Sequence, residues 1–302
     1  MLDRPHDVLG PQSSKVNFAS IYRMNALPPA DIRRILDTPI LVVSVIPGPF
    51  QISYTVPVRH LSPGTTAITF GTETRSFGKG SYLAISHFVD VTSTPDARSV
   101  ARLPLAEIAA ALALTRTHLL DEKLFEGVLN EPGQRTFWPE GPITVSSPQP
   151  TDMDSLSQSL ATISTHLEKL DPQLRHRFQL AARWYMRGHE TPNPVDKILF
   201  WYIALEVYPA QGNTNLVRCV RDVIHSHLYS DLDPGLVKER IGIGRIAGLR
   251  NQIVHDGKSF VELPHDTEFE TSLQKLEAIA TTALRILGDF PPGHELDRWV
   301  RS

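Results

Sequence analysis

The chain is organised around a stretch of twelve residues, and it reads Ile246-Ala247-Gly248-Leu249-Arg250-Asn251-Gln252-Ile253-Val254-His255-Asp256-Gly257. Three apolar residues, Ile246, Leu249 and Ile253, recur at the spacing of one buried helix face. Gly257 follows where a glycine commonly ends a helix. We therefore predict a helix that ends at His255.

Three polar side chains meet at the end of this predicted helix. Asn251 and His255 are four residues apart and share a helix face. Arg250 is turned by about 100° from Asn251, but its long side chain can reach the same space. A guanidinium, an amide and an imidazole that exchanges protons near neutral pH form a set suited to a phosphate group.

The composition bounds the class of protein. The chain has 302 residues, of which 41% are hydrophobic and 21% charged, and this length favours two domains. The formal net charge is -3, so any contact with nucleic acid must be local. Cys219 is the only cysteine, which excludes an intramolecular disulfide and multi-cysteine metal sites. A single cysteine also fits a reducing compartment.

No membrane or targeting segment is expected. No apolar run reaches the roughly 18 residues of a membrane span, and the N-terminal residues 1–7 do not resemble a signal peptide. We therefore predict that the protein has no membrane partner and, given its single cysteine, that it is cytoplasmic. The sequence shows no cluster of metal ligands, so we predict no metal site and no cofactor.

Residues 1–150 are predicted to form a β-rich domain that acts as a sensor or specificity module. Residues 1–27 are predicted to be irregular and residues 28–36 to form a short helix. Runs rich in β-branched and aromatic residues predict antiparallel strands at 39–46, 50–58, 65–70 and 81–91. A helix is predicted over residues 104–120, with 122–129 as its continuation, and short strands at 135–138 and 142–146. Residues 146–152, rich in Pro and Ser, are predicted to be a linker.

Residues 151–302 are predicted to be entirely helical. Leucine and isoleucine recur at three- and four-residue spacing from Leu156 to Leu170, which indicates a long helix. Further helices are predicted over residues 173–187, 195–208, 215–229, 236–255 with a break at the glycines, and 266–287. The predicted fold class is therefore α+β, with a β-rich N-terminal domain followed by an all-α bundle.

Three segments of the helical half together resemble the HEPN domains, and in particular their Apea-like branch. An arginine followed a few residues later by a histidine is the family's minimal pattern, and this chain matches it several times. The pair Arg250 and His255 is distinguished by Asn251 directly after the arginine and by apolar residues before the histidine. The resemblance covers roughly residues 155–290, and its segments are Phe178–Tyr185, Ile198–Glu206 and Leu249–Gly257.

The resemblance implies a helical bundle that dimerises and, in active members, a metal-independent endoribonuclease. In that reaction the 2′-hydroxyl of RNA attacks the adjacent phosphodiester and leaves a cyclic phosphate. On this resemblance His255 is the acid and base, Arg250 stabilises the charge on phosphorus, and Asn251 orients the phosphate or His255. A toxin or antiviral defence effector is implied, controlled by an antitoxin or an activating ligand.

Several roles stay open. Glu206 lies on an inward-facing row of its helix and either pairs with Arg250 and orients it or forms an ion pair elsewhere. Arg183 with Arg187, and Arg218 with Arg221, share helix faces that flank an RNA path or are simply solvated. The alternative to catalysis is an inactive HEPN module that binds RNA or protein and dimerises through the same helices.

Overall fold

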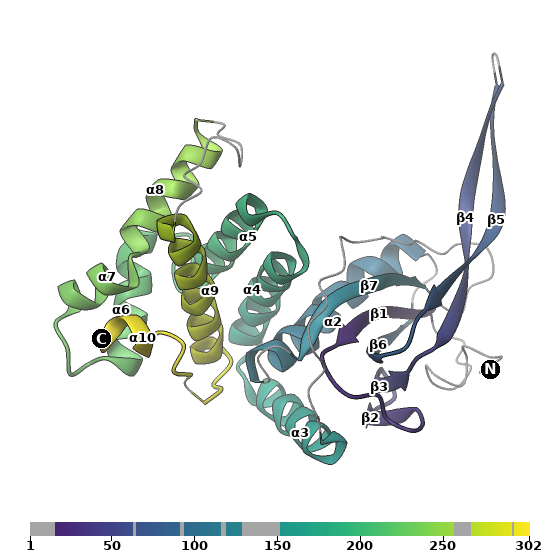
Figure 1. The fold of residues 1–302 in the computed structure, drawn as a ribbon, viewed down its shortest axis with the longest axis horizontal. Coiled ribbons are helices and arrows are strands. Elements are labelled where there is room, and N and C mark those ends of the chain that lie inside the picture. The colour runs from purple at the N-terminus through teal and green to yellow at the C-terminus, as the bar shows by residue number, and fades with distance from the viewer. Residues whose placement is uncertain are drawn as a thin grey trace. The chain divides into compact units, whose positions relative to one another are not determined.

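The computed structural model describes residues 16–62, 65–90, 94–115, 119–128, 152–256, 267–291 and 293–302. The chain divides into two compact units, residues 1–163 and 164–302. The first contains an antiparallel sheet and the second is helical (Figure 1), so the α+β prediction with a β-rich N-terminal part is confirmed. The domain boundary predicted at residues 150/151 precedes this division, which falls within helix α3 (Met153–Lys169).

The N-terminal unit is built on a five-stranded antiparallel sheet with the strand order β2-β3-β6-β1-β7. The strands are β1 (Val16–Met24), β2 (Arg33–Asp37), β3 (Leu41–Pro47), β6 (Ser81–Val89) and β7 (Leu120–Val128). A hairpin of β4 (Phe50–Ser62) and β5 (Thr65–Phe77) forms a separate two-stranded sheet and extends away from the first one in Figure 1.

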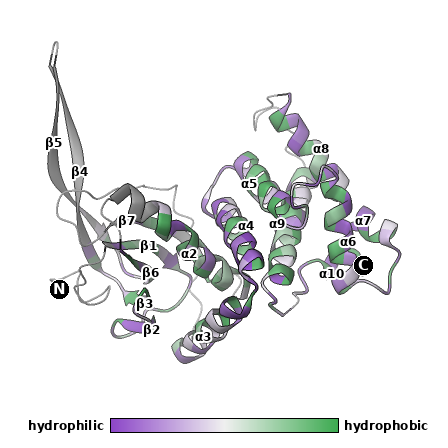
Figure 2. Ribbon diagram, turned by 180° about the vertical axis from the view of Figure 1, so that it is seen from behind, coloured by the Kyte–Doolittle hydropathy of each residue, from purple (hydrophilic) through white to green (hydrophobic). Residues whose placement is uncertain are grey.

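Both faces of the five-stranded sheet are covered. Helix α2 (Thr94–Thr115) contacts β1, β6 and β7, and its described part is largely hydrophobic in Figure 2. On the opposite face Ile21, Ile46 and Tyr82 pack with Phe77 from the base of the hairpin. Because strands buried on both faces lose the alternation of apolar and polar residues, their sequences are harder to recognise.

Three predictions in this unit are wrong for related reasons. Residues 16–24, predicted to be irregular, form β1, where Asn17 and Ser20 are buried beside apolar neighbours. Residues 33–37 form strand β2 rather than the end of a helix. Residues 120–128 form β7 rather than a helical continuation, because pairing with β1 overrides the helical preference of their charged residues. The strands predicted at 135–138 and 142–146, and most of the predicted linker, lie outside the described residues.

Helix α2 also begins earlier than predicted. It starts at Thr94, and Pro104, which we expected at the first turn, lies inside the helix. The predicted strands at 39–46, 50–58, 65–70 and 81–91 are confirmed as β3, β4, β5 and β6 with shifted ends.

The C-terminal unit consists of helices, and every helix predicted there is confirmed. They are α4 (Pro172–Glu190), α5 (Pro194–Val207), α6 (Leu216–Leu228), α7 (Pro234–Ile241), α8 (Ile243–Val254) and α9 (Thr267–Leu287), with a short α10 (Asp297–Val300) at the end. Four of them begin at an Asp or Asn whose side chain accepts a backbone N–H bond, and these caps are Asp171, Asn193, Asn215 and Asp233. Among the described residues, none of the helices is both long and apolar enough to cross a membrane.

The predicted break in the 236–255 helix lies at Gly242. This residue ends α7 and begins α8 with φ of 71°, a left-handed conformation that glycine adopts without a steric penalty. The break gives α8 its own direction, and three of its residues, Ile246, Leu249 and Ile253, are buried as predicted.

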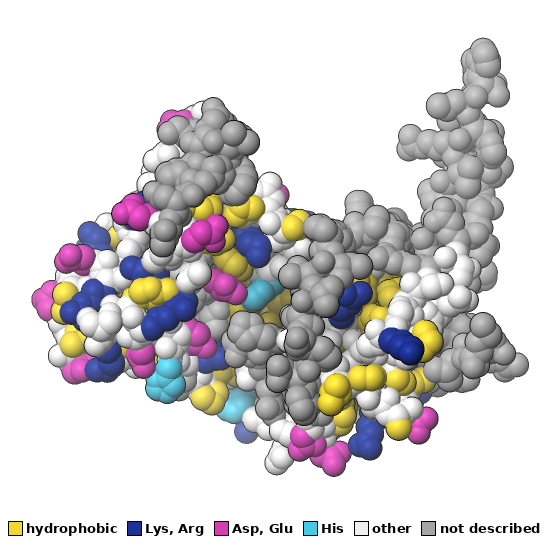
Figure 3. All heavy atoms as spheres, in the orientation of Figure 1, with side chains coloured by type: hydrophobic (Ala, Val, Ile, Leu, Met, Phe, Trp, Pro, Cys, Tyr) yellow, Lys and Arg dark blue, Asp and Glu magenta, His cyan; other side chains and the backbone are white. Residues whose placement is uncertain are grey.

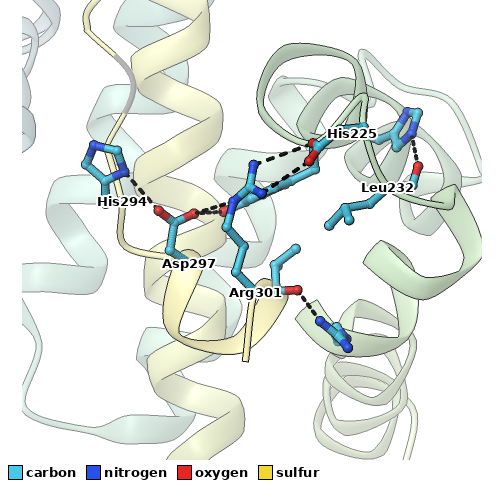
Figure 4. Close-up of polar contacts among 9 residues, drawn as sticks. His225, Leu232, His294, Asp297 and Arg301 are labelled. Atoms are coloured by element: carbon cyan, nitrogen blue, oxygen red, sulfur yellow. Dashed lines mark hydrogen bonds and ion pairs between the residues drawn. The ribbon is translucent and has the colours of Figure 1, made fainter.

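A polar network fixes the C-terminal helix to α6 and α7 (Figure 4). The Tyr229 hydroxyl donates to Asp297 at 2.8 Å, and His294 lies 2.9 Å from the other Asp297 oxygen. These hydrogen bonds, that of Tyr229 first, lower the pKa of Asp297. Arg301 forms an ion pair with Asp231 at 3.2 Å, and Arg240 donates to the Val300 carbonyl. The chain end is therefore part of the helical unit's structure.

Candidate active site on helices α5 and α8

The four predicted catalytic residues lie together, with Arg250 at the centre. Its Nη1 atom is 3.4 Å from Asn251 Oδ1 and 3.4 Å from His255 Nε2. Its Nη2 atom is 3.4 Å from Glu206 Oε1 on α5. We call Arg250, Asn251, His255, Glu206 and Tyr202, introduced below, the Arg250 cluster.

Local helix geometry explains why these groups meet. The buried face of α8 packs into the bundle, which fixes the last turn of the helix. The His255 N–H donates to the Asn251 carbonyl at 2.8 Å and ends the helix there, as predicted. Asn251 and His255 are exposed to solvent, whereas Arg250 is half-buried. Gly257, predicted to cap the helix, lies outside the described residues.

Tyr202 is a member of the cluster that the sequence analysis missed. The Arg250 guanidinium lies over its ring, with Cζ 5.5 Å from the ring centroid. Burial raises the pKa of the Tyr202 hydroxyl. Tyr202 precedes Glu206 by four residues and so shares its helix face, and this spacing was the available signal. The aromatic ring contacts the guanidinium through a cation–π interaction, which leaves the N–H groups of the guanidinium directed at polar partners.

The contacts within the cluster are long. Ordinary N–H hydrogen bonds measure about 2.7–3.2 Å, and the three contacts of Arg250 all measure 3.4 Å. The Glu206 side chain is 42% exposed, so it pairs with Arg250 at the surface rather than pointing fully inward. Arg250 is thus loosely held between several partners and can exchange them for a ligand without breaking a strong bond.

The predicted RNA-binding arginines fall into two different settings. Arg183 and Arg187 on α4 flank Trp184, with their Cζ atoms 5.9 Å and 5.2 Å from its ring. Arg187 also lies 5.7 Å from the ring of Phe200 on α5. The first pair of arginines therefore borders aromatic rings.

The second pair borders a carboxylate. Arg218 and Arg221 on α6 both form ion pairs with Asp222, at 3.5 Å and 2.5 Å. Because Asp222 already compensates part of their charge, they are the weaker candidates for a phosphate contact. In Figure 3, Lys and Arg side chains are interspersed with Asp and Glu on the visible face of the helical unit, in keeping with a local rather than a global basic surface.

A pocket of about 200 Å³ lies away from the Arg250 cluster, at the α7–α8 break. It is lined by residues of α8 and α9 that include Arg245, Glu268 and Lys275. Lys275 donates to the Arg240 carbonyl at 2.6 Å, and Arg245 pairs with Glu268, so both cations of the pocket have partners. This pocket includes no residue of the cluster.

Comparison of the chain with protein-family models, curated proteins and solved structures finds no match. The function of the Arg250 cluster must therefore be argued from its own chemistry.

Proposed function

We propose that the helical unit is a metal-independent endoribonuclease of the HEPN type and that the Arg250 cluster is its active site. The observation that carries the proposal is the meeting of a guanidinium, an imidazole and an amide at one exposed helix end. Arg250 Nη1 lies 3.4 Å from both His255 Nε2 and Asn251 Oδ1. These groups supply a proton acceptor and phosphate ligands within the span of a single phosphodiester.

The proposed reaction uses the RNA's own nucleophile. His255 Nε2 accepts the proton of the 2′-hydroxyl while the 2′ oxygen forms a bond to phosphorus. The bond from phosphorus to the 5′ oxygen breaks, and this oxygen takes up a proton from solvent. The products are a 2′,3′-cyclic phosphate and a 5′-hydroxyl end.

His255 is suited to the proton-accepting role by its contact with Arg250. A guanidinium can only donate hydrogen bonds, so the lone pair of Nε2 is the acceptor in this contact. When a phosphate takes over the guanidinium, Nε2 becomes free to accept the proton of the 2′-hydroxyl. Because the Arg250 contacts are long, replacing them by contacts to a phosphate costs little free energy.

Arg250 and its neighbours act on the phosphate. The planar guanidinium binds two oxygens of the phosphate as charge develops on them. Tyr202 and Glu206 on α5 direct it towards the helix end. The Asn251 amide orients the phosphate or the His255 ring.

We further propose that the protein dimerises through its helical unit and acts on RNA as a toxin or antiviral defence effector, under the control of an antitoxin or an activating ligand. Three apolar residues of α5, Leu199, Ile203 and Val207, remain partly exposed in the single chain. A two-fold interface built on this row would use one surface twice, and Glu206 borders the row. A monomer mass in light scattering at micromolar concentration would argue against the dimer.

The test is cleavage of end-labelled RNA in excess chelator by wild type and His255→Ala at equal concentration. We expect wild type to yield 2′,3′-cyclic phosphate ends and His255→Ala to be slower by roughly 10²-fold. An RNA with 2′-deoxyribose at the cleaved position should resist cleavage. His176→Ala is the matched control, because His176 is an exposed histidine on α4 outside the cluster.

Equal rates for wild type and His255→Ala would end the ribonuclease proposal. If instead both Arg250→Ala and His255→Ala lowered the melting temperature, and wild type cleaved nothing, the inactive RNA- or protein-binding module would replace it.

A further inference from the structure

Helices α4 and α5 present a pair of stacked aromatic rings, and α5 also carries Tyr202 and Glu206 of the Arg250 cluster. The rings of Trp184 and Phe200 are stacked with their centroids 5.8 Å apart and an angle of 28° between their planes. Both residues are partly exposed. The Arg187 guanidinium lies within cation–π distance of both rings, and Arg183 lies near Trp184.

The packing beneath this pair holds it rigid. Trp201 is buried between the helices and donates from Nε1 to the Tyr185 carbonyl at 3.1 Å. Gly188 allows this close approach, because a Cβ atom at residue 188 would collide with the Trp201 indole. The two helices are therefore locked together next to the exposed rings, which are positioned before any ligand arrives.

We propose that Trp184, Phe200 and Arg187 form a platform on which an unpaired base of RNA stacks. Single-stranded RNA is recognised by stacking of its bases on aromatic side chains and guanidinium planes, and the bases of a duplex are not available for this. The inference rests on the proposed function and deepens it, since it defines the substrate class as single-stranded or looped RNA.

Charge favours RNA over a protein as the occupant. Among the residues that the structure describes, no carboxylate forms an ion pair with Arg187, whose contacts are with the two rings. A protein partner that covered the rings would desolvate this cation without compensation, which is costly. An RNA strand brings a phosphate with each base and compensates the charge.

Helix α5 links the platform to the Arg250 cluster. Phe200 precedes Glu206 by six residues, or about 9 Å along the helix axis. Six residues also turn the helix to a position about 120° away around its axis. A single strand that stacks a base on the platform and places a phosphate at Arg250 therefore has to curve round the surface of α5.

Binding to an oligoribonucleotide with 2′-O-methyl riboses tests the platform, because this RNA lacks the attacking hydroxyl and stays intact. The probe is used as a labelled single strand and as a fully paired hairpin, with fluorescence anisotropy as the readout. We expect Trp184→Leu to weaken single-strand binding about tenfold, Trp184→Phe to retain most of it, and Arg187→Gln to weaken it several-fold. Trp299→Leu is the matched control, since it removes an indole next to a guanidinium, that of Arg298, elsewhere on the unit.

The proposal is overturned if folded Trp184→Leu and Arg187→Gln both bind the single strand as wild type does, or if wild type prefers the hairpin. It is also overturned if Trp184→Leu converts a dimer into a monomer, because the rings would then belong to a protein interface. Arg187→Gln keeps the test decisive should Trp184→Leu fail to fold. Loss of binding in these variants without cleavage by wild type would uphold the platform and reject catalysis, whereas cleavage with unchanged binding would do the reverse.

Discussion

The two units of the chain each contain a glutamate between cations, and the two arrangements differ in kind. In the N-terminal unit Glu126 bonds to Arg102 at 2.8 Å and to Lys123 at 2.7 Å, and its side chain is 5% exposed. In the helical unit Glu206 lies 3.4 Å from Arg250 and its side chain is 42% exposed. The first cluster joins β7 to α2, whereas the second lies at the surface where α5 meets the end of α8.

Burial and contact length thus distinguish a charged group that stabilises the fold from one that is available to a ligand. Burial by itself raises the pKa of the Glu126 carboxyl, but the charges and hydrogen bonds of Lys123 and Arg102 outweigh it and hold the pKa at about 2. The Glu126 carboxylate therefore stays ionised and bound to Lys123 and Arg102, which is a structural role. The Arg250 contacts are long and partly solvated, so they constrain the fold little and leave the guanidinium available.

The largest expected effect is that of Glu126→Gln on stability. The substitution keeps the side-chain volume but leaves Lys123 and Arg102 without a carboxylate in a mostly buried place, so the free energy of unfolding should fall by about 3 kcal/mol. Urea denaturation followed by circular dichroism measures it. Glu206→Gln, the matched variant in the surface cluster, should change stability by less than about 1 kcal/mol. Equal losses in the two variants would contradict the distinction.

Low pH should remove the contribution of the Glu126 carboxylate to the free energy of unfolding. The pKa of Glu126 is lowered from 4.5 to about 2 in the folded chain, so its contribution is complete above pH 4.5 and disappears as the pH falls towards 2. The contribution corresponds to about 3 kcal/mol. The difference in unfolding free energy between wild type and Glu126→Gln should therefore shrink over this range. A difference that stayed constant down to pH 2.5 would show that the carboxylate's charge is not the cause.

In contrast to Glu126→Gln, substitution of Arg250 should have a large effect on the cleavage rate and a small one on stability. Arg250→Ala should lower the cleavage rate by roughly 10²-fold, because a preorganised donor to the developing charge is lost. Arg250→Lys should recover only part of the rate, since an ammonium group lacks the planar fork. Arg177→Ala on α4 is the control for removing a half-buried arginine elsewhere. A fall in melting temperature that accounts for the lost activity would make Arg250 structural.

The helical unit was predictable from sequence and the sheet only in part. Helices such as α8 bury one face and expose the other, so their periodicity and their capping residues are visible in the sequence. The position of His255 at a helix end was predicted from that periodicity together with Gly257, and its place beside Asn251 from their four-residue spacing. Strand β1 shows the limit, because it is covered on both faces and contains Asn17 and Ser20, so it lacks both alternation and a strong apolar run.

The contacts between helices were the part of the site that could not be predicted from local sequence patterns. Glu206 and Arg250 are 44 residues apart, and the sequence left two partners open for Glu206. Tyr202 was missed although its four-residue spacing from Glu206 places both on one face of α5, because that spacing does not say that this face will meet α8. Likewise, Asp222 is four residues from Arg218 and directly follows Arg221. Only the side-chain geometry shows that its carboxylate contacts both arginines.

The smallest expected effect, and the sharpest one for the comparison, is that of Glu206→Gln on activity. If Glu206 only positions Arg250, glutamine can still accept one hydrogen bond, so the maximal rate should fall by less than about tenfold, which corresponds to about 1.4 kcal/mol or less. Removal of the competing negative charge should at the same time tighten binding of the RNA phosphate, because Arg250 then loses a charged partner. The expected result is thus a lower KM together with a modestly lower kcat, measured on the same labelled RNA. A loss as large as that of Arg250→Ala would instead place the Glu206 carboxylate in direct contact with the reacting groups, and no change in either constant would mean that Tyr202 alone positions the guanidinium.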